Sequence, residues 1–197
     1  MVLQKAPESA VLWGYGPEGA HVTLTLSGPS QRRTSLADVT NGIWRVTLDP
    51  VEAGGPYNVT AAAQDSTAAL TDVLFGDVWL CGGQSNMWLQ TSKIFNASDE
   101  LRIAEKYPHI RIFMVGLNQS KTEETDLIQV ELPWSVPPTS KSGIGLFIHT
   151  IVYRRVFSRM LRFGSLNWNS ASCSVIQNTY FMMSLHLATM LFVVHCA

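Results

Sequence analysis

Residues 1–70 alternate apolar and polar side chains with a period of two, and this pattern constrains the fold more than any other feature. Val22, Leu24 and Leu26 alternate with polar residues, and the same period recurs at residues 44–48 and 57–61. A period of two places the apolar side chains on one face of a β-strand. Turn-forming residues separate the runs at 14–19, 27–30, 41–42 and 54–56. Short strands at this spacing predict a small all-β unit of the β-sandwich type.

Residues 71–90 form an apolar stretch that ends in a glycine turn and a serine. Residues 73–75 and 78–81 are rich in strand formers, and Gly82-Gly83 then indicates a turn before Ser85. A serine at the start of a helix can expose its hydroxyl, and its backbone N–H can face a developing oxyanion. The alternative interpretation is an ordinary strand and glycine turn, with Ser85 as a helix N-cap.

A second strand follows this stretch after a helical segment. Residues 98–107 have a helical pattern that Pro108 ends, and residues 110–115 read as a buried strand. Strand, helix and strand predict the beginning of an α/β domain with a parallel sheet. Functional residues of such sheets cluster beyond the carboxyl ends of the strands, where Ser85 lies. His109 lies at the opposite end and is a poor candidate for a catalytic base.

Charge is distributed unevenly along the chain. The net charge of −1 argues against nucleic acid as a partner. All 15 acidic residues lie before residue 132, where they outnumber nine basic ones, whereas residues 132–197 hold five basic residues and no acid. The three cysteines have neither disulfide-framework nor zinc-site spacing, so no metal is expected. The front part and the tail therefore differ in composition.

The tail from residue 141 supports two hypotheses. Residues 146–163 could form a basic amphipathic helix, and residues 179–197 carry no charge over a length that can span a bilayer. Arginines before the second segment fit a C-terminal membrane anchor, although His186 and His195 within it weaken that hypothesis. The other hypothesis is a non-native, unstructured tail produced by read-through or alternative splicing.

The block FGDVWLCGGQSNM at residues 75–87 resembles the sialate O-acetylesterase family, serine esterases of the SGNH/GDSL hydrolase group. The resemblance covers roughly the first 140 residues, including the MVLQ, WGYG and PEGAHVTLTL segments. It implies a β-domain before and around a flavodoxin-like α/β hydrolase domain. With the patterns above, it divides the chain into a β-rich unit (1–70), a partial esterase domain (71–140) and the divergent tail (141–197).

The resemblance also implies a reaction and a site. Ser85 would be the nucleophile and an oxyanion-hole donor, while Gly83, Gln84 and Asn86 would shape the turn. The implied reaction hydrolyses O-acetyl esters of sialic acids or sialoglycans through an acyl-enzyme, without a cofactor or a metal. Lysosomal or secreted location is implied too, and Asn-x-Ser/Thr triplets mark three glycosylation candidates, Asn58, Asn96 and Asn118.

The chain departs from the family where the catalytic base belongs. A serine hydroxyl needs a histidine base, which the family supplies from a D-x-x-H block near its C-terminus. The acid-free tail does not match that block, so its histidines at 149, 186 and 195 cannot be placed in it. Met1 aligns inside the family's domain, and residues 1–10 do not form a signal peptide.

These departures predict a fragment that is truncated at both ends and has little or no turnover by itself. The alternative is a non-catalytic short isoform, acting as a binding module or tethered to a membrane through its C-terminal segment.

Overall fold

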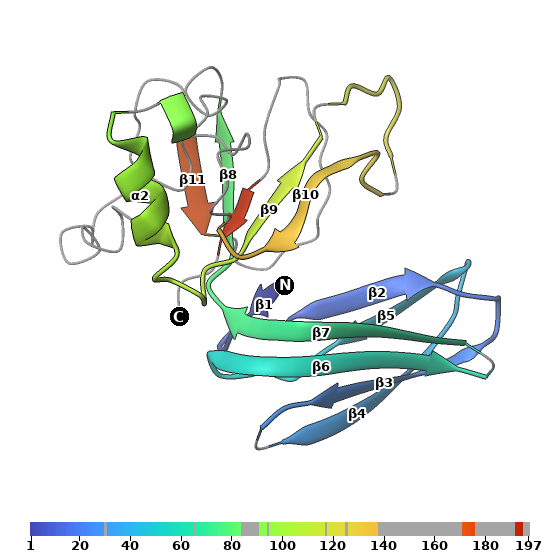
Figure 1. Ribbon diagram of the computed structural model, residues 1–197. Helices are drawn as coiled ribbons and strands as arrows, with labels where there is room; N and C mark the ends of the chain where they lie inside the picture. Colours follow the sequence, from blue (N-terminus) through green and yellow to red (C-terminus); the bar gives the residue numbers. More distant parts are fainter. Residues whose placement is uncertain are drawn as a thin grey trace. The chain divides into compact units, whose positions relative to one another are not determined.

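The computed structural model describes residues 1–29, 31–64, 66–83, 91–93, 95–116, 118–124, 126–137, 171–175 and 192–194 of the chain. Within this part the architecture is mostly β-sheet, as Figure 1 shows. The chain divides into two compact units, Met1–Asp77 and Val78–Cys196.

The first unit consists of a five-stranded sheet and a two-stranded sheet. The strand order in the larger sheet is β1-β7-β6-β3-β4, and β2 pairs with β5 in the smaller one. β1 runs parallel to β7, whereas the other paired strands are antiparallel. The strands are β1 (Val2–Gln4), β2 (Val11–Tyr15), β3 (His21–Ser27), β4 (Arg32–Asp38), β5 (Ile43–Thr47), β6 (Gly54–Ala63) and β7 (Ser66–Gly76).

The alternating pattern of the sequence becomes an alternation of burial in these strands. In β3, Val22, Leu24 and Leu26 are buried, while the residues between them are partly exposed. Successive side chains of a strand point to opposite faces, so one face of β3 meets the core and the other meets solvent. The strands predicted from the alternation at residues 22–26, 44–48 and 57–61 correspond to β3, β5 and β6.

The predicted turn at Asn41-Gly42 lies in the four-residue connection from β4 to β5, between the bridge partners Thr40 and Ile43. Asn41 and Gly42 have positive φ, 56° and 76°, which is the backbone geometry of a type I′ turn. The N–H of Thr40 donates to the carbonyl of Ile43 at 3.0 Å, and the N–H of Ile43 donates back at 3.2 Å. Asparagine and glycine tolerate this left-handed geometry better than other residues, which explains the choice of sequence.

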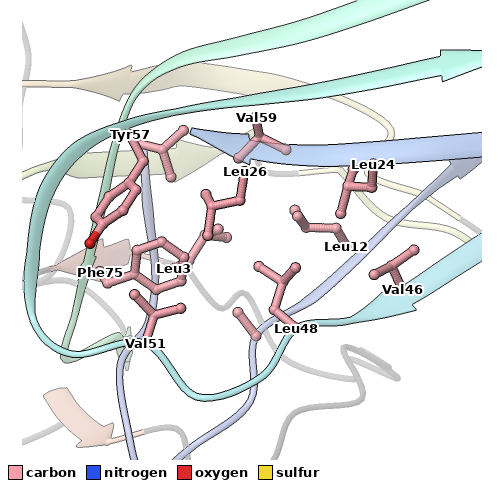
Figure 2. Close-up of a cluster of buried hydrophobic side chains, with 12 residues drawn as sticks. Leu3, Leu12, Leu24, Leu26, Val46, Leu48, Val51, Tyr57, Val59 and Phe75 are labelled. Carbon is pink, nitrogen blue, oxygen red and sulfur yellow. The ribbon is translucent and has the colours of Figure 1, made fainter. Parts of the chain in front are cut away.

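Both sheets of the first unit contribute to one hydrophobic core. Figure 2 shows Leu12 and Val46 of the two-stranded sheet in the same cluster as Leu24 and Leu26 of the larger sheet. Tyr57 and Phe75 meet edge to face, with ring centroids 5.1 Å apart. Burial of apolar area stabilises such a cluster by about 25 cal/mol per Å². The other members of the cluster are Leu3, Ala10, Leu48, Val51, Val59 and Val73.

Strand β7 extends past residue 70, at which the sequence predicted a boundary. Its last residues pair with β1, and the backbone N–H of Lys5 donates to the carbonyl of Gly76 at 3.1 Å. The Lys5 ammonium lies 3.0 Å from the carboxylate of Asp77. The apolar stretch at residues 71–83 thus forms two strands, one in each unit, because residues 73–75 pack into the core of the first unit.

The second unit holds a five-stranded sheet of order β10-β9-β12-β8-β11. The strand pairs described in this sheet are antiparallel. A 3-10 helix and an α-helix lie between β8 and β9 in the sequence. The elements are β8 (Trp79–Gly83), η1 (Thr91–Lys93), α2 (Ala97–Ala104), β9 (Ile112–Val115), β10 (Val130–Ser135), β11 (Ala171–Val175) and β12 (Phe192–Val194).

This sheet differs from the predicted parallel one. The predicted strands are present as β8 and β9, with α2 between them in the sequence, but β12 lies between them in the sheet. Because β12 is antiparallel to both, β8 and β9 still point in the same direction. The backbone groups of β8 and β9 that a parallel partner would have taken are hydrogen-bonded to β12 instead.

Residues 171–175 and 192–194 of the tail form β11 and β12 of this sheet. The amphipathic helix predicted at residues 146–163 lies outside the described residues. In the part of the chain that the structure describes, no helix is long and apolar enough to cross a membrane.

Strand β10 forms the edge of this sheet next to β9. Pro133 lies in β10. A proline has no backbone N–H to donate, and an edge strand tolerates this because one of its sides forms no hydrogen bonds to a neighbouring strand. The rings of Phe113 and Trp134 pack with centroids 5.4 Å apart, and both contact the small cluster around Val115.

Candidate active site after strand β8

Strand β8 leads into the serine segment and is held on both sides. It lies between β11 and β12, and Cys81 has Cys173 as its register partner on one side and Phe192 on the other. A strand that is hydrogen-bonded on both sides is rigid, and a rigid element can hold a functional residue at its end in a fixed position. The predicted strand before the serine is present as Trp79–Gly83. The turn predicted at Gly82-Gly83 is not there, because both glycines are strand residues, in register with Ser172 and Ala171.

The structure places one of the four predicted site residues. Gly83 is the last residue of β8, in register with Ala171. Gln84, Ser85 and Asn86 follow it directly in the sequence and lie outside the described residues. The described part of the chain therefore ends two residues before the candidate nucleophile, at the end of β8.

The helix predicted at residues 98–107 is present as α2, three residues shorter at its C-terminal end. Its N-cap, Asn96, has a left-handed backbone with φ of 60°. Arg102 donates to Asp99 at 3.0 Å. This hydrogen bond, a second one from the Asn96 side chain and the Arg102 charge lower the pKa of the Asp99 carboxyl. The interaction stabilises the first turn of α2 and lies on an exposed surface.

The histidines within the described residues do not form a catalytic set with the serine segment. His109 is exposed just before β9. His21 faces solvent on β3, and its Nδ1 lies 2.6 Å from the Asp38 carboxylate on β4. His149 and the two later histidines lie outside the described residues. Among the described side chains, no group of three or more His, Cys, Asp or Glu could hold a metal ion.

Two features of the structure have no signal in the sequence pattern. The His21–Asp38 pair arises from strand register, because the two residues are direct cross-strand partners. Arg111 is only 7% exposed, and its guanidinium donates to the carbonyl of Pro108. A buried arginine is unusual, and this one fixes the turn that precedes β9.

The three glycosylation candidates are all exposed. Asn58 lies on the solvent face of β6, between the buried residues Tyr57 and Val59. Asn96 is exposed at the start of α2, and Asn118 donates from its side-chain amide to Gln129 at 3.0 Å. Exposure is the first requirement for a glycan, so all three remain candidates.

Comparison with curated proteins finds sialate O-acetylesterases of several mammals as relatives. No protein-family model matches the chain. In an alignment of 169 residues that covers 82% of the chain, the chain is 45% identical to the sialate O-acetylesterase of Mus musculus, and the Rattus norvegicus protein gives the same values. The Homo sapiens sialate O-acetylesterase is 40% identical over 168 residues. The matched region is 31–32% of each relative, so the chain spans about a third of their length.

Comparison with solved structures supports the same assignment at the level of the fold. The crystal structure of a carbohydrate acetylesterase from Xanthomonas citri matches with a TM-score of 0.64 and 23% sequence identity. The match covers 81% of this chain and 35% of that one. The resemblance noted at residues 75–87 is therefore confirmed over most of the chain: it is a homologue of the sialate O-acetylesterases and shares its fold with a carbohydrate acetylesterase.

Proposed function

We propose that this chain is the nucleophile-bearing part of a carbohydrate esterase that hydrolyses O-acetyl esters of sialic acids. The observation that supports the proposal is the 40–45% identity to sialate O-acetylesterases over 82% of the chain. Identity at this level extends well beyond one motif, since it covers both units described above. An acetylated sialic acid, free or in a sialoglycan, is the proposed substrate.

In the proposed mechanism the Ser85 hydroxyl attacks the acetyl carbonyl, and a histidine base takes up its proton. The carbonyl oxygen gains negative charge, which the backbone N–H of Ser85 stabilises as part of an oxyanion hole. Collapse of the tetrahedral intermediate expels the sugar hydroxyl and leaves an acetyl-serine. Water then attacks this ester, releases acetate and regenerates the serine. Gly83, Gln84 and Asn86 shape the turn that presents the hydroxyl.

We also propose that the first unit is a β-sandwich and that the second unit belongs to a flavodoxin-like SGNH domain. The two sheets of the first unit share a core, which supports a β-sandwich. The common direction of β8 and β9, with α2 between them in the sequence, supports a flavodoxin-like SGNH domain. In that domain β12 occupies the place of a parallel strand.

We further propose that the chain alone has little or no turnover, because its sequence lacks the D-x-x-H block of the family. Loss of the base costs orders of magnitude in rate and leaves only oxyanion and binding effects. The exposed positions of the three glycosylation candidates support a secretory or lysosomal route for the protein. The alternative, a non-catalytic binding module, does not require a base.

The test joins this chain to the part of a relative that carries the D-x-x-H block. A chimera replaces the matched part of mouse sialate O-acetylesterase with residues 1–137, and acetate release from an O-acetylated sialoside is measured. We expect turnover in the chimera, a loss of about 10³-fold or more in its Ser85→Ala variant, and no change in a control variant, Thr34→Ala, at an exposed hydroxyl on β4. The 197-residue chain should release no acetate above the level of its own Ser85→Ala variant.

Two outcomes would contradict these proposals. An active chimera that keeps its rate after Ser85→Ala would remove Ser85 as the nucleophile. Turnover by the 197-residue chain that disappears with Ser85→Ala would show that the chain holds its own base, and the proposal of inactivity would be wrong.

A further inference from the structure

Strand β4 is an edge of the five-stranded sheet in the first unit, and one of its sides has no strand partner. Figure 1 shows β4 beside β3, and among the described strands β3 is its only neighbour in the sheet. The pairing runs over all seven residues of β4 without a register shift. Edge strands are commonly protected by a proline, a lysine or a β-bulge, and β4 has none of these. A regular edge of this kind can pair with a strand of another chain.

The hydrogen bonds at the two ends of the β3–β4 pair show which backbone groups point to the free side. The N–H of Val39 donates to the carbonyl of Ala20 at 2.9 Å, and the N–H of Gly28 donates to the carbonyl of Gln31 at 2.8 Å. Hydrogen-bonded positions alternate along an antiparallel pair, so the odd-numbered residues of β4 bond to β3. The N–H and C=O groups of the even-numbered residues therefore point away from β3. These residues are Arg32, Thr34, Leu36 and Asp38.

The same four residues also have exposed side chains, with opposite charges at the two ends of the strand. Arg32 has no carboxylate within ion-pair distance among the described residues. Asp38 contacts His21 through one carboxylate oxygen, Oδ1, and a carboxylate can accept further hydrogen bonds at its other oxygen. Between the charged ends, Leu36 is 77% exposed. A strand that pairs with β4 should therefore be acidic at one end, basic at the other, and apolar between these ends.

Strand β4 itself, reversed in direction, meets this requirement. With Ser35 on a two-fold axis, Arg32 of each copy lies directly opposite the partner's Asp38. Thr34 then lies opposite the partner's Leu36, and the two Leu36 side chains become diagonal neighbours on one face. Each pair joins residues whose backbone groups point outward, so this register also satisfies the hydrogen-bonding pattern of an antiparallel sheet. A shift of the axis to Thr34 or Leu36 would place neither arginine opposite an aspartate.

We propose that this chain forms a symmetric dimer in which β4 pairs antiparallel with β4 of a second copy, in the register centred on Ser35. The two five-stranded sheets then form one continuous sheet, and the free edge of each copy is covered. Charge complementarity at both ends of the strand, together with the exposed Leu36, favours a second copy over an unrelated strand. The dimer does not depend on esterase activity, since none of these residues belongs to the serine segment.

The first test measures the oligomeric state of the 197-residue chain by sedimentation velocity at about 1–100 µM, a range suited to a small interface. We expect a dimer that dissociates on dilution. Arg32→Asp and Asp38→Arg should each raise the dimer Kd about tenfold or more, because each creates two pairs of like charge. The double variant Arg32→Asp/Asp38→Arg exchanges the charges and should restore the wild-type Kd. A matched charge reversal at an exposed residue outside β4, Lys106→Asp, should leave the Kd unchanged.

The second test determines the register. Ser35→Cys places two cysteines directly opposite each other at the axis, at a non-hydrogen-bonded position where Cα atoms of an antiparallel pair lie about 4.5 Å apart. This separation suits a disulfide, so mild oxidation should produce a covalent dimer on a non-reducing gel. Ser66→Cys, at an exposed position on β7, is the matched control. The parent chain controls for the three native cysteines, and both controls should give less covalent dimer than Ser35→Cys.

Three results would each overturn the proposal. They are a chain that stays monomeric over the whole range, a dimer with the same Kd in both single charge variants, and no excess of covalent dimer in Ser35→Cys. Failure of the double variant to restore the Kd would show that Arg32 and Asp38 are not opposite each other, and the proposal would be wrong. If circular dichroism shows that a single charge variant is unfolded, the cross-linking of Ser35→Cys decides the question.

Discussion

Gly28 gives a sharp test of packing in the first unit. It lies against the ring of Tyr57, and a β-carbon at Gly28 would overlap the ring atoms Cδ1 and Cε1. The ring has no free space to enter, because Tyr57 is only 8% exposed and packs edge to face on Phe75. Its hydroxyl also accepts a hydrogen bond from Gln31 at 3.2 Å. Gly28→Ala must therefore displace a ring that is held on three sides.

The expected loss of stability follows from these contacts. Overpacking of a core costs about 1–3 kcal/mol. Separation of an edge-to-face pair adds about 0.5–1.5 kcal/mol, and a lost hydrogen bond adds about 0.5–1.5 kcal/mol. Because a partial shift of the ring would not lose every contact, we expect Gly28→Ala to lower the free energy of unfolding by about 2–4 kcal/mol.

Equilibrium unfolding in urea measures the loss of stability caused by Gly28→Ala, once in the wild-type chain and once in a chain that already carries Tyr57→Ala. Removal of the ring also removes the obstacle, so Gly28→Ala should then cost less than about 0.5 kcal/mol. The slope of the free energy against urea should remain unchanged, since the same surface is exposed on unfolding. A loss below about 0.5 kcal/mol in the wild-type background, or an equal loss in both backgrounds, would refute the reasoning.

Two further predictions concern charge and modification in the same chain. The Arg102 hydrogen bond and its supporting interactions lower the pKa of Asp99 below the ordinary 3.8, so this carboxylate stabilises α2 fully above pH 3.8. The stabilisation is lost as the pH falls through the lowered pKa of Asp99. In Arg102→Ala, carbon-13 NMR titration should show that the titration midpoint of the Asp99 carboxyl rises. An unchanged midpoint would contradict Arg102 as the cause. When the chain is expressed behind a heterologous signal peptide, glycosidase treatment should reduce its apparent mass, and Asn58→Gln, Asn96→Gln and Asn118→Gln should each remove one step. An untreated mass equal to the treated one would remove the glycosylation hypothesis.

Strands β3, β5 and β6 of the first unit could be predicted because each carries its own local signal. Alternation identified β3, and Asn41-Gly42 identified the turn before β5. The full length of β7 could not be predicted, since its residues 66–72 are exposed on both faces and lack alternation. Burial begins only at Val73, so the sequence pattern showed the second half of this strand alone.

The second sheet was predictable in its elements but not in its pairing. β8, α2 and β9 each have a local pattern, whereas the partner between β8 and β9 comes from Phe192–Val194, far along the chain. Local periodicity does not encode which distant segment completes a sheet. The candidate nucleophile came from a short motif, whereas the D-x-x-H block that would supply its base does not occur in this sequence.

The parallel pairing of β1 with β7 has a consequence for the order of events during synthesis. The contacts that close the first unit join residues up to 72 positions apart, such as Lys5 and Asp77. The length-dependent part of the entropy for closing such a loop is about 4 kcal/mol, so this contact should form late in folding. The sheet gains its last strand only after Gly76 has left the ribosome, and β8 begins at Trp79. We therefore expect the serine segment to emerge just as the first unit becomes able to close.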